Sequence, residues 1–183
     1  MKFSSRVSEI DGVTFTHVKY ESDLRGTFVK FHPVREIGPS WESVALSINP
    51  EVGTLRGLHF QVEPFAEEKL VACVQGSIFD VIVDLRPDSR TIGKWTSFEL
   101  SSENAMQVYL PKGVAHGFQT LVPNSIVHYF LSSSYSPESS YSLDPHGDLG
   151  INWPLETALI SERDSRGVSI DIAIKKFANS IKL

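Results

Sequence analysis

The stretch KLVACVQGSIFDVIVDL, residues 69–85, decides the fold class of this chain. β-Branched and other apolar residues fill both of its halves, and the dipeptide Gln75-Gly76 separates them. Apolar runs of this kind, bounded by turn residues, are typical of strands. We therefore predict a pair of strands, 69–74 and 77–85, joined by a turn.

Similar short apolar runs continue on both sides of this stretch, cut by Gly, Pro, Asn and Ser. Further strands are predicted at 13–19, 26–31, 43–48, 55–61, 94–100, 106–110, 115–121 and 126–132. Helix is sparse, with a weak turn near 101–105 and one short helix around 172–179. This spacing is typical of a β-sandwich or barrel, so we expect an all-β chain that forms a single domain over residues 1–183.

The composition is that of an ordinary globular protein and argues against several functions. Lys plus Arg number 17 against 22 for Asp plus Glu, and no basic block offsets the net charge of −5, so no nucleic-acid partner is expected. The single cysteine, Cys73, excludes an intrachain disulfide and a cysteine-based metal cluster. No apolar run approaches the ~18 residues of a membrane span, and the first residues lack the apolar core of a signal peptide. We expect a cytoplasmic location and no membrane partner.

Two of the six histidines stand in patterns that suggest a ligand site. His59 lies in LRGLHFQ, residues 55–61, where an arginine and a glycine share one short predicted strand with it. His116 follows a Pro-Lys-Gly turn in PKGVAHGFQTL, residues 111–121. A glycine inside a strand often marks the close approach of a ligand or another backbone, and imidazole transfers protons near neutral pH. Both histidines are therefore candidate site residues.

Lys69 and Tyr129 are open to two interpretations each. In an ideal strand, Lys69 shares a face with Val71 and Cys73, so it either reaches water at the end of the barrel or points into a cavity that holds an anion. Tyr129 lies in VHYFL, where both faces are apolar. Residue types alone favour a core aromatic side chain with a hydrogen-bonded hydroxyl at this position.

A metal site is the main alternative for a barrel with two separated histidines. Barrels that hold a metal usually supply paired ligands from one strand, His-x-His with a nearby Glu. Here the residue two positions after His59 is Gln61, and Glu63 lies in a loop that contains proline. Because an amide is a poor ligand for metals that prefer imidazole, one histidine per strand leaves a catalytic metal short of ligands. We expect neither a metal nor another cofactor.

Several segments, in order along nearly the whole chain, resemble one family, the dTDP-4-dehydrorhamnose 3,5-epimerases. The matching segments are LRGT at 24–27, GTLRGLHFQ at 53–61, EKLVACVQGSIFDVIVDLRPDS at 68–89, SSENAMQVYLPKGVAHGFQTL at 101–121, YSP at 135–137, INWP at 151–154 and ISERD at 160–164. The resemblance implies a cupin-like jelly-roll barrel, a double-stranded β-helix with a few short helices, that works without metal. It also implies a nucleotide-diphospho-sugar as substrate and a homodimer whose subunits share strands.

The resemblance further implies roles for single residues. It places the catalytic base at His59, the acidic partner of that base at Asp164 and the general acid at Tyr129, and it places Lys69 at a position that contacts the sugar and the diphosphate. The substrate-binding positions that it implies are Arg25, Asn49, Arg56, Gln61, Asp80, His116 and Arg163.

The chemistry of a 4-keto sugar needs side chains of these types. Hydrogens at C3 and C5 are acidic because the C4 ketone delocalises the carbanion as an enolate. A neutral imidazole is a suitable base, and a carboxylate on its other nitrogen fixes the tautomer. A cation such as Lys69 stabilises the enolate oxygen, a tyrosine hydroxyl can return a proton from the opposite face, and arginine suits the diphosphate.

One expectation conflicts with ideal strand geometry. In a regular strand Arg56 and His59 point to opposite faces, yet the resemblance places both near the substrate. Either a bulge at Gly57 or a position of Arg56 at the end of its strand resolves the conflict.

These observations predict an epimerase that inverts C3, C5 or both in a nucleotide-diphospho-4-keto-6-deoxyhexose, as in the conversion of dTDP-4-dehydro-6-deoxyglucose to dTDP-4-dehydrorhamnose. An epimerase of C3 or C5 alone is an alternative within the same class. A non-catalytic sugar-nucleotide-binding cupin is a second alternative, although binding alone requires no base, base partner or acid. A metal-dependent cupin oxygenase is the third.

Overall fold

The computed structural model describes residues 5–31 and 40–182. These residues form, in chain order, β1 (Ser5–Val7), β2 (Thr14–His17), β3 (Lys19–Asp23), β4 (Gly26–Lys30), β5 (Ser43–Asn49), β6 (Thr54–Gln61), β7 (Lys69–Gln75), β8 (Ser77–Asp84), β9 (Trp95–Ser101), β10 (Met106–Leu110), β11 (Val114–Thr120), β12 (Ser125–Leu131), β13 (Ser140–Ser142), β14 (Leu159–Ile160), α1 (Glu162–Ser165) and α2 (Ile170–Ser180). The predicted all-β class is confirmed.

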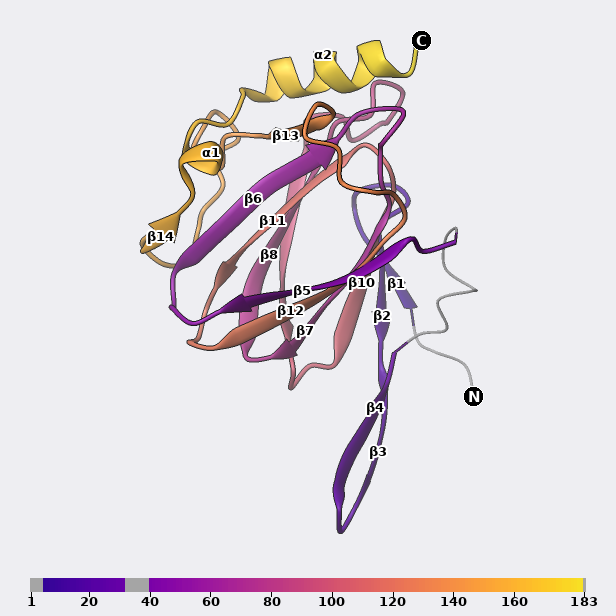
Figure 1. Ribbon diagram of the computed structural model, residues 1–183, viewed down its shortest axis with the longest axis vertical. Helices are drawn as coiled ribbons and strands as arrows, with labels where there is room; N and C mark the ends of the chain where they lie inside the picture. The colour runs from indigo at the N-terminus through magenta and orange to yellow at the C-terminus, as the bar shows by residue number, and fades with distance from the viewer. Residues whose placement is uncertain (1–4, 32–39, 183) are drawn as a thin grey trace.

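Two sheets face each other and enclose the main core (Figure 1). One has the strand order β1-β2-β10-β7-β12-β5, and the other has the order β13-β6-β11-β8-β9, with β14 added in parallel to β6. The strands predicted from the apolar runs are all present. The short β1, β13 and β14 and the single-turn α1 were not predicted, because none has more than four residues and none shows a periodic pattern. β3 was not predicted because its sequence, KYESD, is mostly polar.

The stretch that decides the fold class belongs to both sheets. β7 lies in one sheet and β8 in the other, so these consecutive strands do not pair. The chain changes sheet at Gly76, where φ is +75° and a Cβ atom would lie 2.5 Å from Ser125 Oγ. A residue with a side chain fits neither this dihedral angle nor this space. Gln75-Gly76 is therefore a corner between sheets rather than a hairpin turn.

β8 is apolar on both faces because both are covered. Ile78 and Ile82 belong to the core between the sheets, whereas Val81 and Val83 pack in a second cluster with the buried face of α2. Asp80 lies between Ile78 and Ile82 on the same face of the strand and is 0% exposed. The strand therefore brings a carboxylate into the barrel interior.

β6 carries a bulge where it pairs with β11. The register slips by one residue between Arg56 and His59. Gly57 accommodates the slip with a φ of +109°, and a Cβ atom there would lie 2.7 Å from Gly117 Cα on β11. The bulge lets Arg56 and His59 line the same cavity. Of the two explanations that the sequence left open, the bulge is confirmed.

The hairpin of β3 and β4 projects from the barrel (Figure 1). Within the described part of the chain, these two strands pair only with each other. The tip of the hairpin carries Arg25 beside Leu24, and both side chains are exposed. None of the described helices is long and apolar enough to cross a membrane.

Candidate active site

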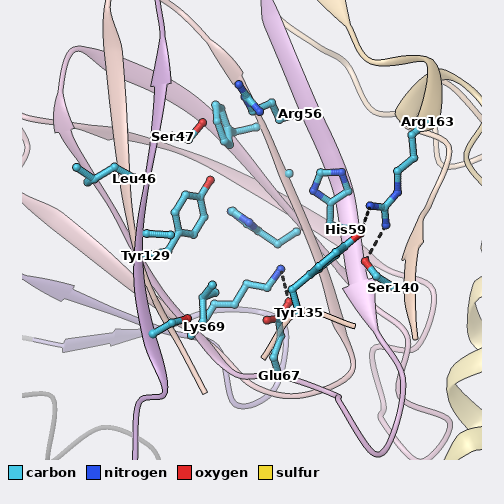
Figure 2. A pocket seen from close by; sticks show the side chains of 16 residues that line it. Leu46, Ser47, Arg56, His59, Glu67, Lys69, Tyr129, Tyr135, Ser140 and Arg163 are labelled. Atoms are coloured by element: carbon cyan, nitrogen blue, oxygen red, sulfur yellow. Dashed lines mark hydrogen bonds and ion pairs between the residues drawn. The ribbon is translucent and has the colours of Figure 1, made fainter. Parts of the chain in front are cut away.

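A cavity of about 410 Å³ lies between the two sheets. Lys69 on β7 and Tyr129 on β12 reach it from one sheet, and His59 on β6 reaches it from the other (Figure 2). His116 on β11 lines it from the same sheet as His59. The interior of the barrel is thus divided: an apolar core fills one part, and polar side chains line the remaining space.

His59 pairs with Asp164, which lies 105 residues later in the chain. The distance from His59 Nε2 to Asp164 Oδ1 is 2.7 Å. Asp164 sits in the single helical turn α1 and is 3% exposed, and Ser161 caps this turn by accepting a hydrogen bond from the backbone N–H of Asp164. The cap fixes the position of the carboxylate against the bulged strand.

The surroundings of Asp164 keep it ionised. Burial alone raises the pKa of this carboxyl, but hydrogen bonds from His59, from Gly57 N–H at 3.2 Å and from Ser142 Oγ at 2.9 Å hold its pKa at about 2. An ionised carboxylate only accepts hydrogen bonds, so His59 donates from Nε2. In the neutral imidazole, Nδ1 then carries the free lone pair and is the atom that can accept a proton.

A second histidine–carboxylate pair lies deeper in the barrel. His116 Nε2 is 2.8 Å from Asp80 Oδ2, and both side chains are buried. Burial raises the pKa of Asp80, and the charges of His116 and Lys69 oppose this shift. Asp80 Oδ1 has no hydrogen-bond partner among the described residues. The ring of His116 also packs edge-on to Tyr129, with 6.1 Å between the ring centroids, so this pair connects both walls of the cavity.

Tyr129 is a partly buried wall residue that keeps its proton. Burial and the nearby charge of Asp80 raise the pKa of its hydroxyl above the ordinary value, although Arg56 opposes them. The phenol is therefore neutral at physiological pH and available as a proton donor. The interpretation of Tyr129 as a pure core residue is replaced by one in which it packs on the core and lines the cavity.

Lys69 forms an ion pair inside the cavity. Its Nζ lies 3.2 Å from Glu67 Oε1, and the two side chains are only 9% and 11% exposed (Figure 2). Of the two interpretations of Lys69, the cavity position is the one that the structure shows.

Two arginines complete the polar lining. Arg56 donates from Nε to Asn49 Oδ1 at 2.7 Å, so its guanidinium is held against a neutral group. Arg163 donates to Tyr135 Oη at 3.1 Å and to Ser140 Oγ at 2.7 Å. Both arginines also line a neighbouring cavity of about 430 Å³ beside α1, which shares His59 with the first.

Four predicted substrate-binding residues lie outside the cavity wall, and one of them, Asp80, stands behind His116. Asn49 is buried behind Arg56, which it holds. Gln61 is also buried, and its amide bonds to backbone groups of two loops, including the N–H of Ser136 at 2.8 Å. Arg25, on the projecting hairpin, is paired with Asp23 at 2.6 Å.

Glu67, Tyr135 and Ser140 line the cavity but were not identified from the sequence. The matching YSP segment could have pointed to Tyr135 as a site residue. The position of Glu67, two residues before Lys69, could have pointed to Glu67. Ser140 carries no sequence signal. In the described ranges, no group of three or more His, Cys, Asp and Glu side chains is arranged to hold a metal ion.

The sequence model of one family, dTDP-4-dehydrorhamnose 3,5-epimerase, matches residues 7–171. The chain belongs to this family. A curated family member from Methanothermobacter thermautotrophicus is 48% identical over 170 residues, which cover 86% of this chain and 89% of the relative. Another, from Sinorhizobium fredii, is 48% identical over 128 residues, and this match spans 68% of the chain but only 65% of the relative.

Solved structures of epimerases share the architecture, a cupin-type jelly roll. A dTDP-6-deoxy-D-glucose-3,5-epimerase from Legionella pneumophila, in complex with dTDP-4-keto-L-rhamnose, aligns with a TM-score of 0.87 and 32% identity over 93% of this chain and 94% of that one. A double mutant of ChmJ, a 3′-monoepimerase from Streptomyces bikiniensis in complex with dTDP, aligns with a TM-score of 0.86 and 28% identity over 92% of this chain and 88% of that one. In that mutant, asparagine replaces a histidine and phenylalanine replaces a tyrosine.

The Asp164 carboxylate gives stability a defined pH dependence. Its pKa falls from 3.8 in the unfolded chain to about 2 in the fold, so its contribution, roughly 2 kcal/mol, is complete above pH ~4 and is lost as the pH falls towards 2. We expect the difference in unfolding free energy between the wild type and Asp164→Asn to shrink over this range, as measured by urea denaturation. The same substitution at the exposed Asp88 is the control, and a difference for Asp164→Asn that stays constant from pH 6 to 2.5 contradicts the prediction.

Proposed function

We propose that this protein is an epimerase that inverts C3, C5 or both in a nucleotide-diphospho-4-keto-6-deoxyhexose, of the dTDP-4-dehydro-6-deoxyglucose to dTDP-4-dehydrorhamnose type. The observation that carries the proposal is the arrangement of one base and one acid on opposite walls of a single cavity. His59, oriented by Asp164 at 2.7 Å, stands on one sheet, and Tyr129 stands on the other.

The proposed reaction is a proton removal followed by a proton return. His59 Nδ1 takes the hydrogen on C3 or C5, and the bonding electrons move onto the C4 oxygen to form an enolate. Tyr129 then gives its hydroxyl proton to the same carbon from the opposite face, which inverts that centre. The tyrosinate regains a proton and the imidazolium loses one, so the enzyme returns to its starting state with no net change in protons.

Each group in this scheme has a defined energetic task. A positioned general base contributes about 10²–10⁴-fold to the rate. Lys69 is placed to stabilise negative charge on the C4 oxygen, and a charged donor of this kind contributes on the order of 3 kcal/mol. Asp164 stays ionised and stabilises the imidazolium when His59 accepts the proton.

Arginines are the groups that we assign to the diphosphate. Arg56 suits it because its planar fork matches phosphate oxygens and its partner, Asn49, leaves the positive charge uncompensated. Arg163 stands at the same cavity with Tyr135. The proposed reaction uses no metal, because the amide of Gln61 is bonded to backbone groups and the ammonium of Lys69 takes the place of a Lewis acid at the C4 oxygen.

The comparisons support this assignment without deciding how many centres are inverted. The two replaced residues of the ChmJ mutant, a histidine and a tyrosine, have the same separation along their chain as His59 and Tyr129 have here. Because ChmJ is a 3′-monoepimerase, inversion of C3 alone is the second candidate function. We also propose a cytoplasmic location, since the buried free thiol of Cys73 suits a reducing compartment.

Replacing the base and the acid separately tests the scheme. In deuterated water with a 4-keto-6-deoxyglucose nucleotide, His59→Asn should abolish both deuterium uptake and inversion, because no enolate forms. Tyr129→Phe loses only the hydroxyl and should still exchange deuterium on the original face, while inverted product falls by about 10²-fold or more. NMR reads both quantities and shows whether C3, C5 or both exchange. Wild-type inversion by Tyr129→Phe contradicts the role of Tyr129 as the acid.

We further propose a homodimer as the working form. The hairpin of β3 and β4 exposes Leu24 and Phe28, and the edge strand β5 exposes the alternate residues Val44, Leu46 and Ile48. Apolar side chains on a projecting hairpin and on a sheet edge favour association with a second copy. Association through this hairpin also offers Arg25 a way to reach a substrate cavity, that of the partner.

Sedimentation velocity tests the dimer. The wild type should sediment with twice the chain mass of 20.4 kDa, and Phe28→Ser should shift the protein towards the monomer because it removes apolar surface from the interface. Ile181→Ser, which changes an exposed apolar residue just after α2, is the matched control and should leave the dimer intact. A wild type that is monomeric at micromolar concentration contradicts the proposal.

A further inference from the structure

Glu67 is a carboxylate in a cavity that is proposed to bind a diphosphate. Among the described residues that line the cavity, it is the acidic one, since Asp80 and Asp164 lie behind the two histidines. Its side chain is 11% exposed and is held by the ion pair with Lys69. Removing a carboxylate from water costs free energy. A carboxylate in this position therefore calls for a functional explanation, since it does little to keep the protein soluble.

The register of β12 places Glu67 and Arg56 at different ends of the cavity. Lys69, the partner of Glu67, lies opposite Leu131 at one end of β12. Arg56 is held by Asn49, which lies opposite Ser125 at the other end. Ser125 and Leu131 are six steps apart on β12, a strand length of about 20 Å at ~3.3 Å per residue. Figure 2 shows Arg56 and Glu67 at opposite ends of the pocket. The Arg56 end therefore offers an uncompensated cation, and at the other end Lys69 and Glu67 form a neutral pair of opposite charges. Arg163, the other arginine of the lining, is held at the side of the cavity by Tyr135 and Ser140.

This difference orients an extended substrate. A diphosphate is stabilised at the arginine end and repelled by the carboxylate of Glu67. A hexose ring is neutral and carries hydroxyl groups, which donate strong hydrogen bonds to a carboxylate. The ring therefore belongs at the end where Lys69 and Glu67 stand, which is also where Lys69 can reach the C4 oxygen.

We propose that Glu67 is a specificity-determining residue that accepts a hydrogen bond from the C3 hydroxyl of the hexose. The inference rests on the proposed epimerase function and on Lys69 as the group that binds the C4 oxygen. Glu67 Oε1 is 3.2 Å from Lys69 Nζ. If Lys69 binds the C4 oxygen, the carboxylate of Glu67 therefore lies near a substituent of C3 or C5, the two carbons next to C4. C5 carries a methyl group and C3 carries a hydroxyl, and only the hydroxyl can donate to a carboxylate.

The chain offers a matched control at the next residue. Glu68 accepts a hydrogen bond from Tyr109 Oη at 2.5 Å and does not line the cavity. Glu68→Gln therefore makes the same chemical change one residue away, outside the site. Glu67→Gln keeps an acceptor oxygen but no charge, and Glu67→Ala removes both.

The experiment measures deuterium exchange at both carbons next to the ketone, C3 and C5, for two substrates, a 4-keto-6-deoxyhexose nucleotide and its 3-deoxy analogue. The wild type should favour the hydroxylated substrate in kcat/KM by about 100-fold, because the analogue cannot donate the hydroxyl hydrogen bond to the buried carboxylate. Glu67→Ala should reduce this preference by about 10-fold or more, Glu67→Gln should retain part of it, and Glu68→Gln should retain all of it. The preference is a ratio within one variant, so a loss of folded protein does not change it.

Two results overturn the inference. If Glu67→Ala slows both substrates equally, Glu67 acts only through Lys69 or through the fold. If the wild type does not distinguish the two substrates, no group of the site binds the C3 hydroxyl. Failure of the proposed function has a different signature, since the wild type then exchanges deuterium with neither substrate.

Discussion

The buried carboxylate of Asp164 is the group on which the arrangement of the site depends. A carboxylate taken out of water must receive hydrogen bonds, and Asp164 receives them from Gly57 and His59 on β6 and from Ser142 on β13. Each of these contacts joins segments that are far apart in sequence. One charge therefore fixes the bulged strand, the orientation of the imidazole and the helical turn α1 at the same time.

The apolar pattern predicts the strands but not the way they pair. Runs rich in Val and Ile mark β7 and β8, because a strand covered on two faces needs no polar residues. The same pattern cannot show that Gly76 turns a corner between two sheets, since the decisive contact, with Ser125, lies far along the chain. Single-turn and two-residue elements such as α1 and β14 depend on tertiary contacts and leave no local pattern.

Residue types alone identify His59 and His116 as candidate site residues, and the structure places both in the lining of one cavity. Nothing local connects His59 to Asp164, so that pairing entered only through the resemblance and is now visible as a 2.7 Å contact. Glu67 was missed because a glutamate before a strand is ordinarily a solvated residue. The roles of the catalytic and substrate-binding residues stay predictions, and the substitutions at His59, Tyr129 and Asp164 test them.

A double-mutant cycle with His59→Asn, Asp164→Asn and the two combined, read by the rate of deuterium exchange at C3 and C5, tests whether Asp164 acts through His59. If Asp164 acts by orienting the imidazole and stabilising its charged form, it has no function once that ring is absent. Asp164→Asn alone should then lower the rate by up to about 10⁴-fold, yet it should cost little more when His59→Asn is already present. Penalties that multiply in the double mutant would show that the two residues act independently and would contradict the claim.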